Sequence, residues 1–282
     1  MELYADLHLH STFSDGSFTP EQLVLKAERI GLSAIALTDH DSIDGIERFL
    51  AACEKSKVRG VAGVEISVEY ESGTMHMLGY FVDHHCAPFL EHLAKIRAGR
   101  ISRNEIILKK LNQLGFPLTI ADVSSFAGET NVGRLHFAQA LISFGFVKTR
   151  QEAFDRFLAK GKSAYAERFR LSPVEGIAII QKAGGLAVLA HPSSLNVDKQ
   201  ALNIVVSKLA KAGLQGLEVY SPKLTQAQVK QYQAITKKFD LVATGGSDFH
   251  GDAMPGVQLG TGFGSLNVPD SVLVELDERR RK

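Results

Sequence analysis

The sequence has few of the features that mark secreted, membrane or nucleic-acid-coating proteins. Its two cysteines, Cys53 and Cys86, stand in no metal-binding or redox spacing, so reduced thiols are expected. No apolar run approaches the roughly 20 residues of a membrane helix, and the first residues lack the basic start and apolar stretch of a signal peptide. The formal net charge of +1 argues against a general nucleic-acid or membrane-surface binder, although it allows a local basic pocket. These absences predict a cytoplasmic protein with no membrane partner, and no obligate protein partner is evident.

Two common catalytic signatures are also missing. The chain has neither a Gly-rich phosphate loop nor a Gly-x-Ser-x-Gly elbow, which weakens a kinase or serine-hydrolase interpretation. With 45% hydrophobic and 22% charged residues among 282, the composition is that of an ordinary globular protein. The length suits either one large α/β barrel or two ordinary domains.

Short apolar runs alternate with helical patterns in the first part of the chain. Strands are predicted at 3–8 and 34–37, and at 61–70 and 75–82, where a four-residue turn suggests a hairpin. Thr19, Pro20 and Gln22 form the capping pattern of a helix that ends near Gly31. A second helix is predicted at 43–55.

The middle of the chain is helical throughout, and the β/α alternation then resumes. The helical patterns run from 88 to 158 and begin with a long amphipathic stretch at 89–114. Further on, helices are predicted at 173–183, 199–212 and 226–239, and strands at 186–190, 214–220 and 241–245. Repeating β/α units imply a parallel sheet covered by helices and favour barrel closure. We therefore expect an α/β barrel (1–87 and 169–282) interrupted by an all-helical insertion (88–168), with a charged, fraying tail at 278–282.

Potential metal ligands recur where the predicted strands end. At the carboxyl ends of barrel strands such side chains converge on one mouth, and alternate residues of an extended segment share a face. Nine ligand-type residues would meet there: His8, His10, Asp15, His40, Glu65, His76, His191, Asp248 and His250.

So many imidazoles and carboxylates would be costly to bury together without cations. Nine ligands exceed the needs of one ion, so two or three divalent ions are implied, with Glu65 a natural bridge. Mixed His and carboxylate ligation suits Zn, Mn or Fe better than Ca. A water between two such ions becomes a nucleophile near neutral pH, while the ions polarise phosphoryl oxygens. The pattern therefore predicts a metal-dependent phosphoesterase.

These segments closely resemble the four motifs of the PHP (polymerase and histidinol phosphatase) superfamily. The resemblance covers nearly the whole chain. Two further stretches, 133–138 and 183–192, are similar to the branch of 3′,5′-nucleotide bisphosphate phosphatases and 5′-to-3′ exoribonucleases. The segments of this sequence that match the four superfamily motifs are Asp6-Leu7-His8-Leu9-His10, Ser14-Asp15-Gly16, Leu37-Thr38-Asp39-His40-Asp41, Gly63-Val64-Glu65, Leu189-Ala190-His191-Pro192 and Gly246-Ser247-Asp248-Phe249-His250.

The resemblance implies a distorted (β/α)7 barrel with a trinuclear centre, Mn²⁺ being expected and Fe²⁺, Zn²⁺ or Mg²⁺ possible. By motif, one metal and the attacking water would be held by His8, His10, Glu65 and Asp248. A second metal would be held by Glu65, His76 and His191, and a third by Asp15, His40 and His250. Histidinol phosphatases of the superfamily often have His where Asp15 stands, so this sequence favours nucleotides.

A phosphate ester also needs cationic partners, and arginine provides the strongest contacts. Arg134 and His136 stand near the start of a helix in the insertion, whose N-terminus itself favours an anion. Together with Lys162 and Arg100 they are predicted to bind substrate, with the insertion acting as a lid. Arg97, Arg100 and Arg103 share one helix face, a pattern that is more often merely solvated.

The expected substrate is a nucleoside 3′,5′-bisphosphate, and the same site could trim short RNA from the 5′ end. Histidinol phosphate is the alternative substrate, and a non-catalytic metal-stabilised module is the alternative class. Asp39 and Asp41 flank a ligand and are expected to orient it rather than to bind metal, and Glu218 is a further candidate for this role.

Overall fold

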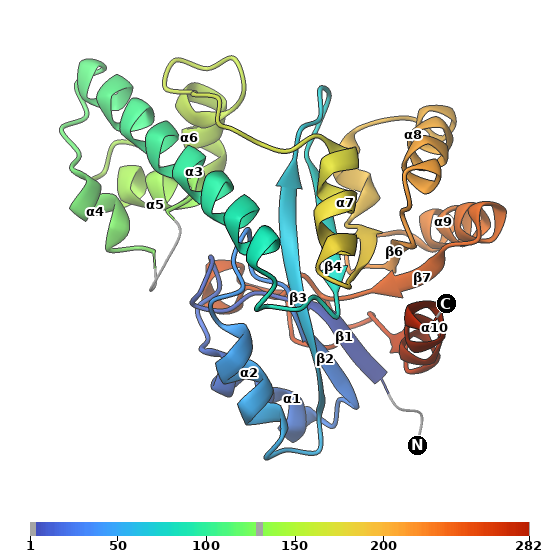
Figure 1. The fold of residues 1–282 in the computed structure, drawn as a ribbon. Helices are drawn as coiled ribbons and strands as arrows, with labels where there is room; N and C mark the ends of the chain where they lie inside the picture. The colour runs from blue at the N-terminus through green and yellow to red at the C-terminus, as the bar shows by residue number, and fades with distance from the viewer. Residues whose placement is uncertain (1–3, 128–131, 282) are drawn as a thin grey trace.

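The computed structural model describes residues 4–127 and 132–281 (Figure 1). One sheet with the order β7-β6-β5-β4-β3-β2-β1-β8 forms its centre. The strands are β1 (Tyr4–Leu9), β2 (Ala34–Leu37), β3 (Arg59–Val68), β4 (Met75–Tyr80), β5 (Leu186–Leu189), β6 (Gly216–Tyr220), β7 (Val242–Gly245) and β8 (Val268–Pro269).

Helices surround this sheet and extend to one side of it. They are α1 (Pro20–Ile30), α2 (Ile46–Cys53), α3 (Ala87–Gln113), α4 (Ile120–Ser124), α5 (Arg134–Ser143), α6 (Arg150–Ala153), α7 (Pro173–Lys182), α8 (Lys199–Lys211), α9 (Gln226–Phe239) and α10 (Ser271–Arg280). A π-helical turn, Phe154–Leu158, continues α6, and 3-10 turns lie at Pro192–Leu195 and Gly251–Ala253. No helix within 4–127 and 132–281 is long and apolar enough to cross a membrane.

The sheet is mixed, because the predicted hairpin adds one antiparallel strand to the parallel strands of the β/α units. Strands β1, β2 and β3 are parallel, as are β5, β6 and β7, but β4 runs antiparallel to both β3 and β5. The short turn between β3 and β4 forces this reversal, because parallel neighbours need a long crossover connection. The reversal has a consequence for chemistry, since residues at the start of β4 lie beside the carboxyl end of β3.

The first and last parts of the sheet meet, which nearly closes it. Leu9 forms a parallel bridge with Phe249, and the His10 N–H donates to the Phe249 carbonyl at 3.0 Å. Gly246 permits this approach, because a Cβ there would lie 2.4 Å from the backbone nitrogen of His8. The predicted distorted α/β barrel is confirmed, with β8 a two-residue strand added antiparallel to β1.

Local capping explains where several helices begin and end. Thr19 and Gln22 form a capping box at α1, Pro20 opens the helix, and Gly31 ends it at φ +79°. Helix α2 is shorter than the predicted 43–55, because the N–H groups of Asp44 and Ile46 bond to Ser42 and Ile43 in a preceding turn.

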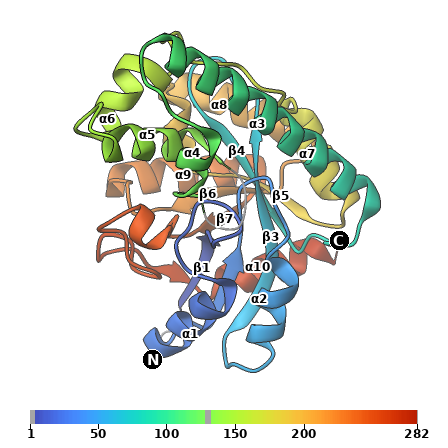
Figure 2. The ribbon, with the colours of Figure 1, turned by 90° about the vertical axis from the view of Figure 1, so that its left-hand side faces the viewer.

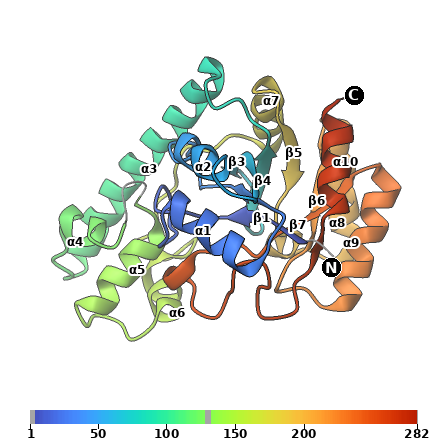
Figure 3. The ribbon, with the colours of Figure 1, turned by 90° about the horizontal axis from the view of Figure 1, so that it is seen from below.

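The middle of the chain forms a helical layer with its own apolar core. Helices α3 to α6 gather on one side of the molecule, and α7 to α10 lie on the other (Figures 1 and 3). Leu111, Phe137, Leu141 and Leu158 are among the buried side chains of a separate apolar cluster in this layer. The predicted helical insertion is thus present, while the proposed boundaries at 87/88 and 168/169 stay a prediction.

The charged C-terminal segment is ordered, contrary to the expected frayed tail. Helix α10 extends to Arg280, and Arg279 Nη1 lies 2.9 Å from Asp240 Oδ2. The helix is held because Val272, Leu273 and Leu276 are buried in an apolar cluster with residues of the sheet. Lys282 lies outside the described residues.

Candidate metal centre and adjoining cavity

Side chains from six strands and the loops that follow them converge at the barrel mouth. The structure brings together all nine predicted metal ligands, called here the ligand cluster. Potential ligand atoms lie within 4.8 Å of one another in four overlapping sets: His10, Asp15, His40 and His250; His8, Glu65 and His191; His8, His10 and Asp248; and His40, Glu65 and His76. His76 joins from the start of β4, which the antiparallel pairing places opposite Ser67 of β3.

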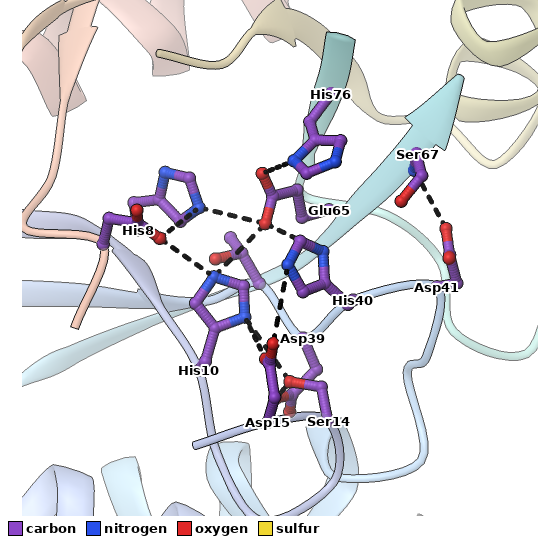
Figure 4. Close-up of polar contacts among 12 residues, drawn as sticks. His8, His10, Ser14, Asp15, Asp39, His40, Asp41, Glu65, Ser67 and His76 are labelled. Atoms are coloured by element: carbon purple, nitrogen blue, oxygen red, sulfur yellow. Dashed lines mark hydrogen bonds and ion pairs between the residues drawn. The ribbon is translucent and has the colours of Figure 1, made fainter. Parts of the chain in front are cut away.

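Glu65 stands at the centre of the ligand cluster (Figure 4). Its Oε2 lies 3.2 Å from both His8 Nε2 and His10 Nε2, and 3.1 Å from His40 Nδ1. Its Oε1 lies 2.7 Å from His76 Nδ1 and 2.9 Å from His191 Nε2. One carboxylate therefore faces five imidazoles, as a bridging ligand would.

Among the described residues, several buried polar atoms of the ligand cluster lie close to one another but form no hydrogen bond of good geometry. An unsatisfied buried polar atom is costly, and a bound cation is one way to satisfy it. Because these atoms are all nitrogen or carboxylate oxygen donors, the residues fit divalent metal ions. The atoms are His8 Nε2, His10 Nε2, Asp15 Oδ1, His40 Nδ1 and Glu65 Oε2.

A second layer of carboxylates holds the ligands in place. Glu218 Oε1 lies 3.0 Å from His8 Nδ1, and its other oxygen accepts the backbone N–H of His191 at 2.5 Å. Asp39 accepts hydrogen bonds from Ser11 and Ser14 in the loop that carries Asp15. Such contacts fix ring orientation and tautomer in metal sites. Glu218 was detectable from the sequence only as a carboxylate near a strand end.

The electrostatics of the ligand cluster are strongly perturbed. Burial acts to lower the pKa of His10, but the neighbouring carboxylates of Asp248 and Glu65 outweigh it and raise the pKa to about 10. Burial dominates at His40 and lowers its pKa to about 3. Without a cation, these shifts favour the protonated form of His10 and the neutral form of His40.

A large cavity opens directly beside the ligand cluster. Its volume is about 1160 Å³, and Asp15, His40 and His76 belong to its wall. We call it the basic cavity, because five arginines line it: Arg100, Arg103, Arg134, Arg168 and Arg170. They come from α3, from α5 and from the segment that returns to the barrel (Figure 2).

The predicted substrate-binding residues divide between this cavity and the outer surface. Arg100, Arg134 and His136 line the basic cavity, and His136 Nδ1 also accepts the Gly133 N–H at 2.9 Å. Lys162 is exposed and is not among the lining residues; Lys160 lines the cavity instead. Gly161, which stands between the two lysines, has φ +82°.

Arg103, which the sequence suggested only as part of a solvated stripe, is buried. It is 3% exposed, and its Nε and Nη2 have no hydrogen-bond partner among residues 4–127 and 132–281. Burial and then the like charges of Arg100 and Arg168 lower its pKa to about 8. By contrast, Arg97 of the same stripe does not line the cavity and pairs with Asp44 at 3.2 Å. A buried guanidinium with two nitrogens that no described residue accepts from favours an anion as their partner.

Comparisons with known proteins agree with this arrangement. The family model of the PHP domain matches residues 6–177. A 5′-3′ exoribonuclease from Haemophilus influenzae is 33% identical over 245 residues, which are 87% of this chain and 89% of the relative. A 3′,5′-nucleoside bisphosphate phosphatase from Chromobacterium violaceum is 30% identical over 263 residues, 90% of each protein.

A solved structure shows the same fold. An amidohydrolase from Chromobacterium violaceum, with bound sulfate and no metal, is 29% identical with a TM-score of 0.86, and the match covers 98% of this chain and 96% of the other. The predicted resemblance to the PHP superfamily and its nucleotide-hydrolysing branch is thus confirmed. From the family model and from relatives that match nearly its whole length, the chain belongs to the PHP domain family.

Proposed function

We propose that this protein is a metal-dependent phosphoesterase that removes the 3′-phosphate of nucleoside 3′,5′-bisphosphates and trims short RNA from the 5′ end. The observation that carries the proposal is the shared wall of the ligand cluster and the basic cavity, formed by Asp15, His40 and His76. A substrate with two phosphates could thus present one to the ligand cluster and the other to the arginines.

The proposed metal-holding sets are those implied by the family motifs. His8, His10, Glu65 and Asp248 would hold one ion, Glu65, His76 and His191 a second, and Asp15, His40 and His250 a third, Mn²⁺ being the proposed metal. Divalent ions so held would activate water and polarise the phosphoryl oxygens. The chain's own contribution is to fix the ligands, through Glu218 and Asp39, and to bind the rest of the substrate.

The phosphate that is not cleaved is assigned to the basic cavity. Arg134 and Arg100 offer bidentate contacts from the helical layer. His136 adds an imidazole, and burial favours its neutral form because it lowers the pKa of the group. Arg103 supplies N–H groups for which the described part of the chain offers no acceptor. Lys162, which is exposed, is the least supported of the predicted contacts.

Two features favour nucleotides and RNA over histidinol phosphate. A monophosphate with a positively charged amine would leave the arginines of the basic cavity without an anion. The cavity volume of about 1160 Å³ also exceeds what a small substrate needs. The activities named for the Haemophilus and Chromobacterium relatives point the same way. A non-catalytic role is disfavoured because all nine ligands are present.

The proposal is tested by phosphate release from Mn-loaded protein. Adenosine 3′,5′-bisphosphate, AMP, histidinol phosphate and a short 5′-phosphorylated RNA are compared side by side. We expect rapid turnover of the bisphosphate and cleavage of the RNA, with AMP and histidinol phosphate poor. Preference for histidinol phosphate would contradict the assignment of the basic cavity, and inert behaviour of all four with metal bound would contradict the phosphoesterase itself.

A further inference from the structure

Asp41 is neither a member of the ligand cluster nor one of the residues that line the basic cavity. It follows His40 in the chain, is fully buried, and is in none of the four potential ligand sets. Figure 4 shows its carboxylate pointing toward Ser67, near the end of β3, rather than toward Glu65. Its side chain therefore has a task other than binding a cation.

That carboxylate joins two arginines from distant parts of the chain. Asp41 Oδ2 accepts hydrogen bonds from Arg100 Nε at 2.8 Å and from Arg100 Nη2, and it lies 3.3 Å from both Nη1 and Nη2 of Arg168. Arg100 belongs to α3, whereas Arg168 lies in the segment that returns to the barrel. Both arginine side chains are largely buried, at 11% and 4% exposure.

The Asp41 backbone is fixed in an unusual conformation. Its φ is +52°, in the left-handed region that costs free energy for residues other than glycine. Its N–H donates to the Glu65 carbonyl at 2.8 Å, and its Oδ1 accepts the Ser67 N–H at 2.9 Å. The carboxylate is thus tied to β3, the strand that carries the central ligand Glu65, and cannot rotate freely.

The single negative charge of Asp41 does not neutralise both arginines. Two guanidinium groups share one carboxylate, so this trio keeps one net positive charge. Arg103 adds a further cation, and its Nε and Nη2 find no partner in the described residues. A buried ion pair is weak evidence for a purely stabilising role, because the desolvation of its charges offsets their attraction.

We propose that Asp41 is a positioning residue that holds Arg100 and Arg168 in the geometry in which they bind the uncleaved phosphate of the substrate. It thereby fixes the distance between that phosphate and the ligand cluster. The inference rests on the proposed function, because it assigns the basic cavity to that phosphate.

The test is Asp41→Asn, measured in two ways on Mn-loaded protein. Asparagine keeps the size and an oxygen acceptor for Ser67 but removes the charge that holds two guanidinium groups. We expect KM for adenosine 3′,5′-bisphosphate to rise at least tenfold while kcat falls less than threefold. The dissociation constant of AMP, measured by calorimetry, should weaken by a similar factor, since AMP carries the uncleaved 5′-phosphate.

Asp44→Asn is the matched control. Asp44 pairs with Arg97 and so also joins the loop before α2 to α3, but this pair lies at the surface outside the cavity. KM and AMP affinity should stay within twofold of wild type. In a background of Arg100→Ala and Arg168→Ala, adding Asp41→Asn should change AMP affinity less than twofold, because the groups that Asp41 positions are gone.

The outcomes separate this inference from the proposed function. Unchanged AMP affinity and KM in Asp41→Asn would overturn the inference, and so would a fall in kcat alone, which would place the effect at His40. If AMP binding depends on Asp41 but wild-type protein does not cleave the bisphosphate, the proposed function fails, whereas the positioning of the two arginines by Asp41 for a nucleotide phosphate is supported. If Asp41→Asn does not fold, Arg168→Lys is the variant that tests the inference. Lysine keeps the positive charge but loses the paired N–H groups, and an unchanged AMP affinity in this variant would overturn the inference.

Discussion

Arg134 combines a position on the wall of the basic cavity with restraints from its own neighbours. Its Nη1 donates to the Leu158 carbonyl at 3.2 Å, and its guanidinium lies 5.8 Å from the ring centre of Phe154 and 5.5 Å from that of Tyr165. These contacts keep the group oriented while leaving other N–H groups for a ligand. Such preorganisation is what anion recognition requires.

Replacing Arg134 with alanine should therefore impair substrate binding more than metal binding. Charge-assisted hydrogen bonds contribute about 1.5–3 kcal/mol, so KM for adenosine 3′,5′-bisphosphate should rise about 10- to 100-fold. Metal content should not change, because Arg134 is in none of the ligand sets. Arg156→Ala is the control, since Arg156 forms a surface pair with Glu152. An unchanged KM in Arg134→Ala would remove Arg134 from the substrate site.

The proton on His10 predicts how metal binding depends on pH. The folded-state pKa of about 10 lies above the ordinary value of 6.5, so the stabilisation that this proton gives the metal-free protein is complete below pH 6.5 and is lost as pH rises through 10. A cation must displace the same proton. Its affinity should therefore rise with pH, by about tenfold per pH unit for each proton displaced.

Calorimetric titration of chelator-treated protein with Mn²⁺ at pH 7.0, 7.75 and 8.5 measures this dependence. Repeating each titration in buffers of different ionisation enthalpy gives the number of protons released. Affinity that is constant over this range, with no proton release, would contradict the protonated state assigned to His10.

The sequence could predict the ligand cluster because each ligand lies in or near a predicted strand, close to one of its ends. Short apolar runs in the sequence show where those strands begin and end. It could not predict the environment of Arg103, since helical periodicity tells which face a residue shares but not what packs against that face. Spacing likewise did not show that Lys160, and not Lys162, lines the basic cavity, because this depends on how the chain folds around the two residues.

At the scale of elements, strand β4 and helix α10 depart most from the expectations. A hairpin between β3 and β4 was predicted. That β4 also runs antiparallel to β5 is known only from the strand pairing in the structure. Helix α10 escaped prediction because charged residues dominate its end, and its apolar positions are few. Its order comes from tertiary packing, which helical propensity does not report.

Truncation of a buried α10 side chain tests that packing. Leu276 is fully buried in the apolar cluster that α10 shares with the sheet. Leu276→Ala should lower the free energy of unfolding by about 2–5 kcal/mol, measured by urea denaturation of the whole chain. Val274→Ala, at a 55% exposed position on the same helix, should change it by less than about 0.5 kcal/mol. Equal effects of the two substitutions would mean that α10 is not packed as described.

At the scale of the whole molecule, the barrel and the helical layer together form the basic cavity. Barrel residues such as His40 and His76 line one side, and residues of the helical layer such as Arg100 and Arg134 line the other. The sequence indicated both parts, because the change from β/α alternation to purely helical patterns is strong. It could not give the cavity between them, because that depends on how two separately packed cores are oriented.

The most direct test of the central claim, a phosphoesterase that works through several metal ions, is a metal titration of activity. Chelator-stripped protein receives increasing equivalents of Mn²⁺, and phosphate release from adenosine 3′,5′-bisphosphate is measured at each step. Nine ligands in overlapping sets predict no activity without metal and a plateau at two or three equivalents per chain. A plateau at one equivalent or fewer, or activity that survives complete chelation, would contradict the account.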